Sequence, residues 1–319
     1  MIRFPNGKSV TFLCAAGALG LDGHDAGNGI VRPWKWLFKL LGQHRPHAWG
    51  LITKTLTYTP RKGRLRWWCP WRCVRPLGAG NWCNSVGLTN PGYRAWIERY
   101  YARAVTSCDV VIPSLSFDQD AGPFAGSHGI VSAQAQAMLD DFNKLDGLSA
   151  LEINLSCPNS GHVDFEWMCW LLRQLGPLSR YPFIVKLGPD LSQLVKAISI
   201  LDSSILAFDV INTVPFTTVY PHQRSPLAGY GLEGGVSGPA IRQRARIALA
   251  TTAWAVRTAK VISGGGITTV AEIDKRFRLG ASAVTIGTAF LRPWLPLQLQ
   301  RGYVSTTSLS GWLPPTYVL

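Results

Sequence analysis

The cysteine at position 157 of this 319-residue chain stands in a setting that favours acid–base chemistry. It follows the apolar run 151–155, and Asn154 and Asn159 flank it with amide donors and acceptors. A lone cysteine is more often a small buried hydrophobe. Polar neighbours and nearby lysine charge change that expectation, because they favour the thiolate, which can accept a proton. Cys157 is therefore the candidate catalytic residue.

Two lysines lie at apolar runs that are expected to be buried. Lys54 follows the run 50–53, and Lys186 lies within the run 183–187. An unpaired ammonium group in such a place costs several kcal/mol. Acidic residues are scarce at the ends of the apolar runs. We therefore expect each lysine to meet an anionic ligand or a reduced cofactor ring rather than a protein carboxylate.

Glycine-rich turns follow two apolar runs in the last third of the chain. The first reads Ser263-Gly264-Gly265-Gly266 and the second reads Ile286-Gly287-Thr288. Glycine lets backbone N–H groups approach phosphate oxygens, and a helix N-terminus behind the turn adds positive potential. A triple glycine alone is more often a plain turn. Two such turns on successive runs indicate a phosphorylated cofactor.

The elements that must position these residues repeat along the chain. Eight short apolar or β-branched runs alternate with stretches of helical periodicity. This count and the chain length predict an α/β fold, the (β/α)8 TIM barrel, whose site lies at the C-terminal ends of its strands. The expected strands are 11–14, 50–53, 109–113, 151–155, 183–187, 209–212, 260–263 and 283–286, and the expected helices are 93–104, 132–145, 165–175, 191–201, 240–259 and 270–279.

Nothing in the sequence divides the chain, so residues 1–319 are expected to form a single domain. Two loops are long for a compact barrel, namely 55–89 and 220–239. Loops of this length are often active-site lids. We expect both to lie over the C-terminal face of the barrel.

The composition is that of a folded protein with a basic surface. Hydrophobic residues make up 47% of the chain, which excludes disorder. The 32 Lys and Arg against 18 Asp and Glu leave a net charge of +14, so anionic partners are favoured. No apolar run reaches 18 residues, and no membrane-spanning helix is expected.

The cysteine count favours a reducing compartment. Seven cysteines, an odd number spread over a long chain, do not resemble a secreted disulfide framework, so we expect a cytoplasmic protein. The apolar stretch 10–21 imitates a secretory signal, but it contains the first expected strand and must be retained. Cys69, Cys73 and Cys83 cluster without a fourth nearby ligand, so no metal site is predicted.

Taken together, these residues resemble a known family, the dihydroorotate dehydrogenases, which are FMN-dependent TIM barrels of pyrimidine synthesis. The likeness spans about residues 12–290, and its motifs follow the family's order. Cysteine at position 157, where the membrane-bound class has serine, resembles class 1. The matching segments are Asn154-Leu155-Ser156-Cys157-Pro158-Asn159, Asn84-Ser85-Val86-Gly87-Leu88-Thr89-Asn90-Pro91-Gly92, Ile211-Asn212-Thr213-Val214, Gly234-Gly235-Val236-Ser237-Gly238-Pro239-Ala240-Ile241, Ser263-Gly264-Gly265-Gly266-Ile267 and Ile286-Gly287-Thr288-Ala289.

The resemblance implies oxidation of dihydroorotate to orotate in the de novo synthesis of UMP. Cys157 would remove the C5 proton while the C6 hydride passes to flavin N5, and Lys186 would stabilise negative charge on the reduced ring. The residues implied in substrate binding are Lys54, Asn84, Val86, Gly87, Leu88, Asn154, Asn159, Asn212 and Thr213. Those implied in FMN binding are Ala15, Ala16, Gly17, Lys54, Asn154, Lys186, Ile211, Ser237, Gly238, Gly265, Gly266, Gly287 and Thr288.

The resemblance leaves the electron acceptor open. Residues 235–241 favour the NAD-linked subtype, which works with a separate iron–sulfur electron-transfer subunit, whereas a lone homodimer would indicate fumarate. Quinone is the least favoured acceptor, because the membrane class has paired docking helices before the barrel and only ten residues precede the first expected strand here. No stable nucleic-acid partner is expected.

Some segments depart from the family pattern. Pro215 stands where a second asparagine is common, and the stretch after Asn159 is shorter than in typical class 1 members. The stretch 21–49 is longer than usual. It carries an apolar stripe within 34–41, which fits either a membrane-surface helix or, as we expect, the first barrel helix.

The segment 61–75 carries six basic residues, three tryptophans and no acid. Cations and aromatic faces are typical of nucleic-acid binding, and they support a rival family, the tRNA dihydrouridine synthases, which are also FMN barrels. Too few residues follow the eighth strand for the RNA-binding domain of that family. A flavin- or RNA-binding scaffold without turnover is a third alternative. We interpret 61–75 as a lid that steers an anionic substrate and covers the bound ring with its tryptophans.

Overall fold

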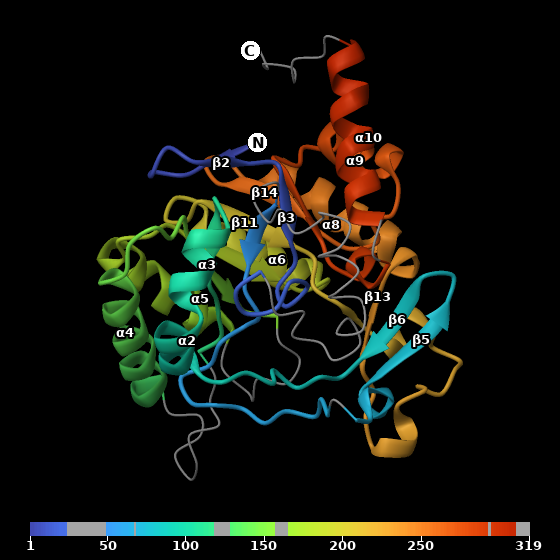
Figure 1. Ribbon diagram of the computed structural model, residues 1–319, viewed down its shortest axis with the longest axis horizontal. Helices are drawn as coiled ribbons and strands as arrows, with labels where there is room; N and C mark the ends of the chain where they lie inside the picture. Colours follow the sequence, from blue (N-terminus) through green and yellow to red (C-terminus); the bar gives the residue numbers. More distant parts are fainter. Residues whose placement is uncertain (24–48, 67, 118–127, 157–164, 293–294, 311–319) are drawn as a thin grey trace.

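The computed structural model describes residues 1–23, 49–66, 68–117, 128–156, 165–292 and 295–310. Parallel strands form its centre, and helices surround them (Figure 1). The central strands are β3 (Phe12–Cys14), β4 (Gly50–Ile52), β7 (Val111–Ile112), β8 (Ser114–Leu115), β9 (Leu151–Asn154), β10 (Phe183–Leu187), β11 (Ala207–Val210), β14 (Lys260–Ser263) and β15 (Ala283–Ile286).

Strands β7 and β8 are two halves of one barrel strand. Pro113 stands between them and has no N–H group to donate. β7 pairs with β4 on one side, β8 pairs with β9 on the other, and the Pro113 carbonyl accepts from the N–H of Glu152 at 2.8 Å. The sheet therefore closes as eight parallel strands, and the predicted TIM barrel is confirmed. The third strand was predicted to end at Pro113, but it continues to Leu115.

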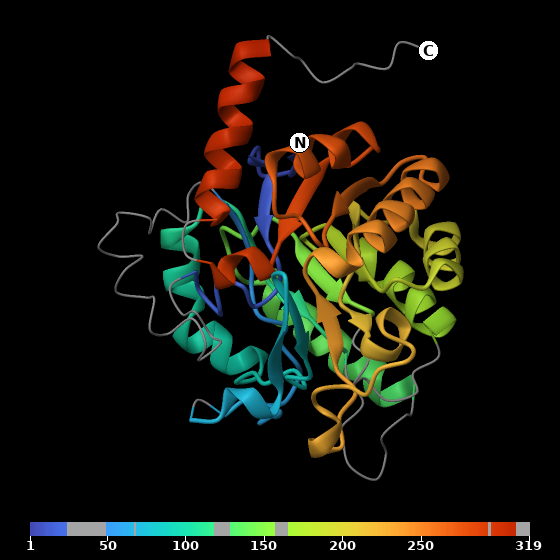
Figure 2. The ribbon, with the colours of Figure 1, turned by 90° about the vertical axis from the view of Figure 1, so that its right-hand side faces the viewer.

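Amphipathic helices cover the barrel on the outside (Figures 1 and 2). α5 and α6 have the predicted bounds, whereas the predicted helix 93–104 is two helices that meet at Tyr100, and α8 begins only after a short turn at Pro239. The longer helices are α2 (Tyr93–Arg99), α3 (Tyr101–Ser107), α4 (His128–Asn143), α5 (Phe165–Leu175), α6 (Leu191–Leu201), α8 (Arg242–Ala255), α9 (Val270–Arg278) and α10 (Leu295–Ser310). The short ones are α7 (Phe216–Val219) and the 3-10 turns η3 (Pro70–Arg72), η5 (Gly176–Leu178), η6 (Ala228–Tyr230), η7 (Pro239–Ile241) and η8 (Thr288–Leu291).

Two of these helices begin at capping residues that the sequence supplies. The Asp190 carboxylate accepts from the N–H groups of Ser192 and Gln193 at the start of α6. The Thr269 hydroxyl accepts from the N–H of Glu272 at the start of α9. α10 extends away from the barrel (Figure 2). No described helix is long and apolar enough to cross a membrane.

A hairpin closes the N-terminal end of the barrel. It consists of β1 (Ile2–Arg3) and β2 (Ser9–Val10), which pair antiparallel. The side chain of Ile2 is fully buried among apolar residues on or next to the barrel strands, such as Leu13, Ile52 and Ile184. This end is therefore sealed, and any site must lie at the opposite end.

A small antiparallel sheet joins the two long loops. Its order is β12 (Val214–Pro215), β13 (Gly235–Ser237), β6 (Asn81–Asn84) and β5 (Val74–Gly78). β13 comes from the loop 220–239 and pairs with β6 from the loop 55–89. In Figure 1 this sheet lies toward the end of the barrel opposite the β1–β2 hairpin. The two loops thus form one structure beside the C-terminal ends of the barrel strands.

Candidate active site

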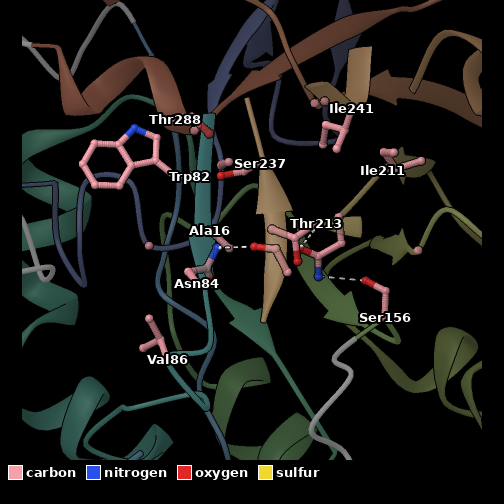
Figure 3. Close-up of a pocket in the computed structure, with 18 of the residues that line it drawn as sticks. Ala16, Trp82, Asn84, Val86, Ser156, Ile211, Thr213, Ser237, Ile241 and Thr288 are labelled. Carbon is pink, nitrogen blue, oxygen red and sulfur yellow. Dashed lines mark hydrogen bonds between the residues drawn. The ribbon is translucent and has the colours of Figure 1, made fainter. Parts of the chain in front are cut away.

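A cavity of about 810 Å³ opens at the C-terminal ends of the barrel strands. The small sheet of β6 and β13 forms part of its wall (Figure 3). Cys157 and Asn159 lie outside the described residues, as does most of the stretch 21–49. All the other predicted site residues line the cavity: Ala15, Ala16, Gly17, Lys54, Asn84, Val86, Gly87, Leu88, Asn154, Lys186, Ile211, Asn212, Thr213, Ser237, Gly238, Gly265, Gly266, Gly287 and Thr288.

A chain of amide and hydroxyl groups orders one part of the cavity (Figure 3). Asn212 Nδ2 donates to Ser156 Oγ at 3.0 Å, and Ser156 Oγ donates to Asn154 Oδ1 at 3.2 Å. Asn154 Nδ2 in turn donates to Thr55 Oγ1 at 3.3 Å. Both predicted asparagines are thus held in one orientation. Ser156, the last described residue before Cys157, is held by the same contacts.

Asn84 reaches the cavity from the opposite wall, at the end of β6 (Figure 3). Its Nδ2 donates to the carbonyl of Gly235, its register partner on β13, at 3.4 Å. A Cβ atom at Gly235 would lie 2.3 Å from Thr213 Oγ1, so the sheet approaches the barrel closely only because this residue is glycine. Leu88, just beyond, has a φ of +54°, which is rare for a residue with a side chain and is typical of functional turns.

Small residues at the end of β3 form a smooth wall of the cavity. Ala15, Ala16 and Gly17 lie there, and a Cβ atom at Gly287 would come within 3.2 Å of Ala15 Cβ. Lys54 packs next to Gly17, and its N–H donates to the Gly20 carbonyl at 2.8 Å. A wall of this kind leaves room for a flat ring to lie against the backbone.

Three charged side chains meet inside the barrel at the cavity floor. Lys186 Nζ lies 3.8 Å from Asp209 Oδ2 and 4.0 Å from Glu152 Oε1, and all three residues are buried. The expectation that Lys186 would meet a ligand rather than protein carboxylates is therefore wrong as argued. That expectation rested on the scarcity of acidic residues at the strand ends. Glu152 and Asp209 instead lie within β9 and β11 and point inward. Asp209 is the register partner of Lys186.

The electrostatics of this layer keep Lys186 charged. Burial works to lower the pKa of Lys186, but the attraction of Glu152 and Asp209 outweighs it and raises that pKa above its ordinary value. Burial raises the pKa of Asp209 to about 7, against the attraction of Lys186. Asp209 Oδ1 accepts from Thr285 Oγ1 at 3.1 Å. Within the described chain, Asp209 Oδ2 and Glu152 Oε2 have no hydrogen-bond partner.

The glycine turn after β14 has the geometry of a phosphate cradle. Gly265 and Gly266 have φ values of +83° and +75°, and a Cβ at Gly266 would lie 2.9 Å from Arg242 Cα. In the described part of the chain, the N–H groups of Gly265, Gly266 and Gly287 have no hydrogen-bond partner. Ser237 and Thr288 line the same region of the cavity. Unpaired amides beside hydroxyl groups fit the phosphate of FMN.

The segment 61–75 differs from the interpretation drawn from the sequence. Arg64 lines the cavity and donates to Ser85 Oγ at 3.0 Å, as a substrate-steering residue should. Arg66 instead donates to carbonyls of its own loop. Trp68 and Trp71 are 59% and 50% exposed and do not line the cavity. Their side chains therefore do not lie where the lid interpretation requires, and Trp67 lies outside the described residues.

Among the described tryptophans, Trp82 on β6 lines the cavity (Figure 3). Sequence reasoning missed it because it lies outside the family-like motifs and outside the tryptophan-rich segment. It also missed the inward residues Glu152, Asp209 and Thr285. Their signal was their position: each lies two residues beyond a buried alanine on or just before the same strand.

The six described cysteines are buried free thiols. Cys14 and Cys108 are buried, as expected of small hydrophobes, and burial raises the pKa of each thiol to about 12. Cys69, Cys73 and Cys83 are buried free thiols. Burial raises the pKa of Cys73 and of Cys83. The described residues contain no group of three or more histidine, cysteine or acidic side chains that could hold a metal ion.

The fold places the chain among the TIM barrels, and glycine turns like those in its cavity bind phosphate in many of them. Residues 47–302 match the family profile of dihydroorotate dehydrogenase. The chain is 32% identical over 249 residues to the catalytic subunit of dihydroorotate dehydrogenase B (NAD(+)) of Desulforudis audaxviator. The aligned region covers 76% of this chain and 75% of that protein. The chain is 33% identical over 258 residues to a Solibacter usitatus protein whose name assigns it to the fumarate-linked A form, with 78% of each chain covered.

A solved structure has the same fold. The dihydroorotate dehydrogenase of Eimeria tenella, crystallised with ferulenol, superposes with a TM-score of 0.64 at 16% identity, covering 83% of this chain and 76% of that one. The chain belongs to the dihydroorotate dehydrogenase family, whose enzymes oxidise dihydroorotate with FMN.

Proposed function

We propose that the chain oxidises dihydroorotate to orotate in pyrimidine biosynthesis, with FMN against the glycine turns and the substrate against the asparagine-lined part of the same cavity. The observation that carries this assignment is the convergence of the two ligand sets. Unpaired glycine amides and ordered asparagine side chains line one cavity, and a charged lysine lies at its floor. Family membership supports both ligands.

Different residues of the cavity would bind the phosphate, the flat ring and the substrate. The amides of Gly265, Gly266 and Gly287 would hold the phosphate, and Ala15 and its small neighbours would carry the flat ring. Bound FMN would supply a ring that accepts the substrate hydride. Asn84, Asn154 and Asn212 would orient the amides and carboxylate of dihydroorotate, since their side chains are fixed by hydrogen bonds.

Two residues would handle charge and protons. Lys186 stays protonated beside two buried acidic side chains, so it would present a fixed positive charge to a bound ring. Cys157 would take the C5 proton of the substrate on its sulfur. The ordered contacts of Ser156 support this role, because they fix the chain immediately before the cysteine.

The proposal also covers the electron acceptor and the partner subunit. We propose the NAD-linked B form, which acts with an iron–sulfur electron-transfer subunit, and a cytoplasmic setting for a homodimer of the catalytic chain. Names of relatives support the B form, because the proteins from Desulforudis audaxviator and Solidesulfovibrio magneticus are catalytic subunits of that kind.

The test uses the purified full chain. It should contain non-covalent FMN that dihydroorotate bleaches under anaerobic conditions. Replacement Cys157→Ala should abolish bleaching near neutral pH while orotate still perturbs the flavin spectrum. Near-normal bleaching of that variant contradicts the role of Cys157, and a protein that ignores added FMN contradicts the assignment as a whole. Reoxidation by fumarate alone, without a partner subunit, contradicts the B form.

A further inference from the structure

A buried arginine lies directly behind the glycine turn. Arg276 on α9 has no exposed surface. Its Nε donates to Glu272 Oε1 at 2.6 Å, and one terminal nitrogen donates to Ser263 Oγ at 2.9 Å and to the Gly264 carbonyl at 3.2 Å. The other terminal nitrogen donates to the Gly265 carbonyl at 2.7 Å. Most of its hydrogen bonds therefore go to the turn that is proposed to hold phosphate.

The remaining donor completes the set. It reaches the Arg242 carbonyl at 3.4 Å, so all five N–H groups of the Arg276 guanidinium have acceptors. Arg242 donates from its own Nε to the Gly266 carbonyl at 3.1 Å. Three successive carbonyls of the turn are thus held by guanidinium groups from the protein side.

Glu272 fixes Arg276 in place and balances its charge. The carboxylate is 3% exposed and also accepts from Arg246 Nε at 3.1 Å. The Thr269 hydroxyl caps α9 by accepting from the N–H of Glu272 at 3.2 Å. Burial lowers the pKa of Arg276, and the neighbouring Glu272 carboxylate offsets part of that effect. The guanidinium therefore remains a cation with a defined orientation.

Because each peptide is planar, fixing a carbonyl of the turn also fixes the direction of the N–H group in the same peptide. The carbonyl of Gly264 and the N–H of Gly265 belong to one planar trans peptide, so they point in opposite directions. The same holds for the carbonyl of Gly265 and the N–H of Gly266. Because Arg276 takes both carbonyls, both N–H groups face away from α9. These are the amides without partners at the cavity.

We infer that Arg276 is a positioning residue for the flavin phosphate, because it holds the carbonyls of Gly264 and Gly265 and thereby aims the amides of Gly265 and Gly266 at the phosphate oxygens. Arg276 itself does not line the cavity. This inference rests on the proposed binding of FMN in that cavity.

The test compares FMN with riboflavin, which lacks the phosphate. Flavin-stripped full-length protein is titrated with each flavin, and the quenching of flavin fluorescence gives two dissociation constants. Arg276→Lys keeps the charge beside Glu272 but cannot hold both carbonyls, because an ammonium is a point donor and the guanidinium is a fork. We expect it to weaken FMN binding about tenfold and to change riboflavin binding less than about twofold.

Arg246→Met is the matched control. Arg246 shares Glu272 with Arg276, yet among the described residues it donates to no carbonyl of the turn. It should leave the ratio of FMN to riboflavin affinity unchanged. If Arg276→Lys does not fold, as thermal unfolding would show, the double variant Glu272→Gln/Arg276→Gln removes both buried charges and carries the same expectation.

The outcomes separate the two proposals. Wild-type protein that binds riboflavin as tightly as FMN contradicts the phosphate site itself. A preference for FMN in the wild type that persists unchanged in folded Arg276→Lys leaves that site standing and overturns the role of Arg276. An equal loss of preference in Arg246→Met also overturns it, because the effect would then come from the charge cluster as a whole.

Discussion

The barrel interior has two layers that differ in chemistry although the same strands build both. On β10, Ile184 lies in the apolar layer, and Lys186 lies in the polar layer two residues further along. Side chains two residues apart face the same side of a strand, so both point inward. Neighbouring strands repeat the pattern, with pairs Ile112 and Ser114, Ala150 and Glu152, Ala207 and Asp209, and Ala283 and Thr285.

The two adjacent layers contribute differently to stability and to function. The apolar layer buries side chains that need no partner, so each contributes to folding. The polar layer buries three ionisable side chains and leaves Glu152 Oε2 and Asp209 Oδ2 without hydrogen bonds in the described chain. Buried charges stabilise a fold poorly, because desolvation offsets their attraction. The polar layer is therefore explained by the cavity above it and not by folding.

Removal of Lys186 is expected to have the largest effect. Lys186→Met leaves Glu152 and Asp209 buried without their cation, which should lower the free energy of unfolding by about 3–5 kcal/mol. Loss of the fixed charge beside the ring should also slow flavin reduction by dihydroorotate at least about 100-fold. Urea titration and anaerobic stopped-flow absorbance measure the two effects.

A second variant checks that explanation. Adding Asp209→Asn to Lys186→Met removes one of the two acidic groups that are left buried without a cation, so part of the lost stability should return while the rate stays low. If the double variant is no more stable than Lys186→Met, the three charges do not act as one group.

A substitution in the apolar layer should lower stability and leave the rate of flavin reduction nearly unchanged. Ile184→Ala removes buried carbon two residues before Lys186, and it should cost about 2–5 kcal/mol in the free energy of unfolding. The rate of flavin reduction by the remaining folded protein should change less than about threefold, since the cavity is untouched. A large loss of rate at full folding would show that the two layers are mechanically coupled.

The two layers also mark what the sequence can and cannot predict. The eight strands, the glycine turns and Asn154 follow from local patterns, because each lies in a run of apolar residues or just after one. Asn84 and Asn212 were expected in the site only through the family resemblance. The contact of Lys186 with Glu152 and Asp209 does not, because it depends on register across three strands of a closed barrel. Arg276 shows the same limit: its position on α9 follows from periodicity, but its carbonyl partners do not.

The pH dependence of stability offers a finer comparison. The pKa of Asp209 is about 7 in the folded protein and near 3.8 in an unfolded chain, so folding favours the protonated acid. The resulting stability is fully present below pH 3.8 and is lost as the pH rises through about 7. Between these values the wild type should lose up to about 1.4 kcal/mol per pH unit relative to Asp209→Asn.

Parallel urea titrations of both proteins from pH 4.5 to pH 7.5 measure that difference. Lys186 and Glu152 are the charged groups that face Asp209, and both remain in the variant. Identical slopes for the two proteins would mean that Asp209 is ionised throughout, as a simple salt bridge with Lys186 would require.

The smallest expected effect concerns Arg64, where the cavity meets the basic segment 61–75. Arg64 lines the cavity beside Ser85, whereas Arg66, two residues later, donates to its own loop. Arg64→Gln should therefore raise the KM for dihydroorotate about tenfold, since it removes a charge-assisted contact with an anion. Arg66→Gln is the matched control and should change KM less than about twofold at physiological salt.

The salt dependence decides between contact and steering. A contact at the cavity wall is screened little by salt, whereas attraction over the surface is screened beyond about 8 Å. If Arg64→Gln and Arg66→Gln raise KM equally, and only at low salt, the segment steers the substrate as a whole and Arg64 makes no special contact. If neither changes KM but both weaken binding of tRNA, the lid interpretation of 61–75 is wrong, and the basic segment serves a nucleic acid instead.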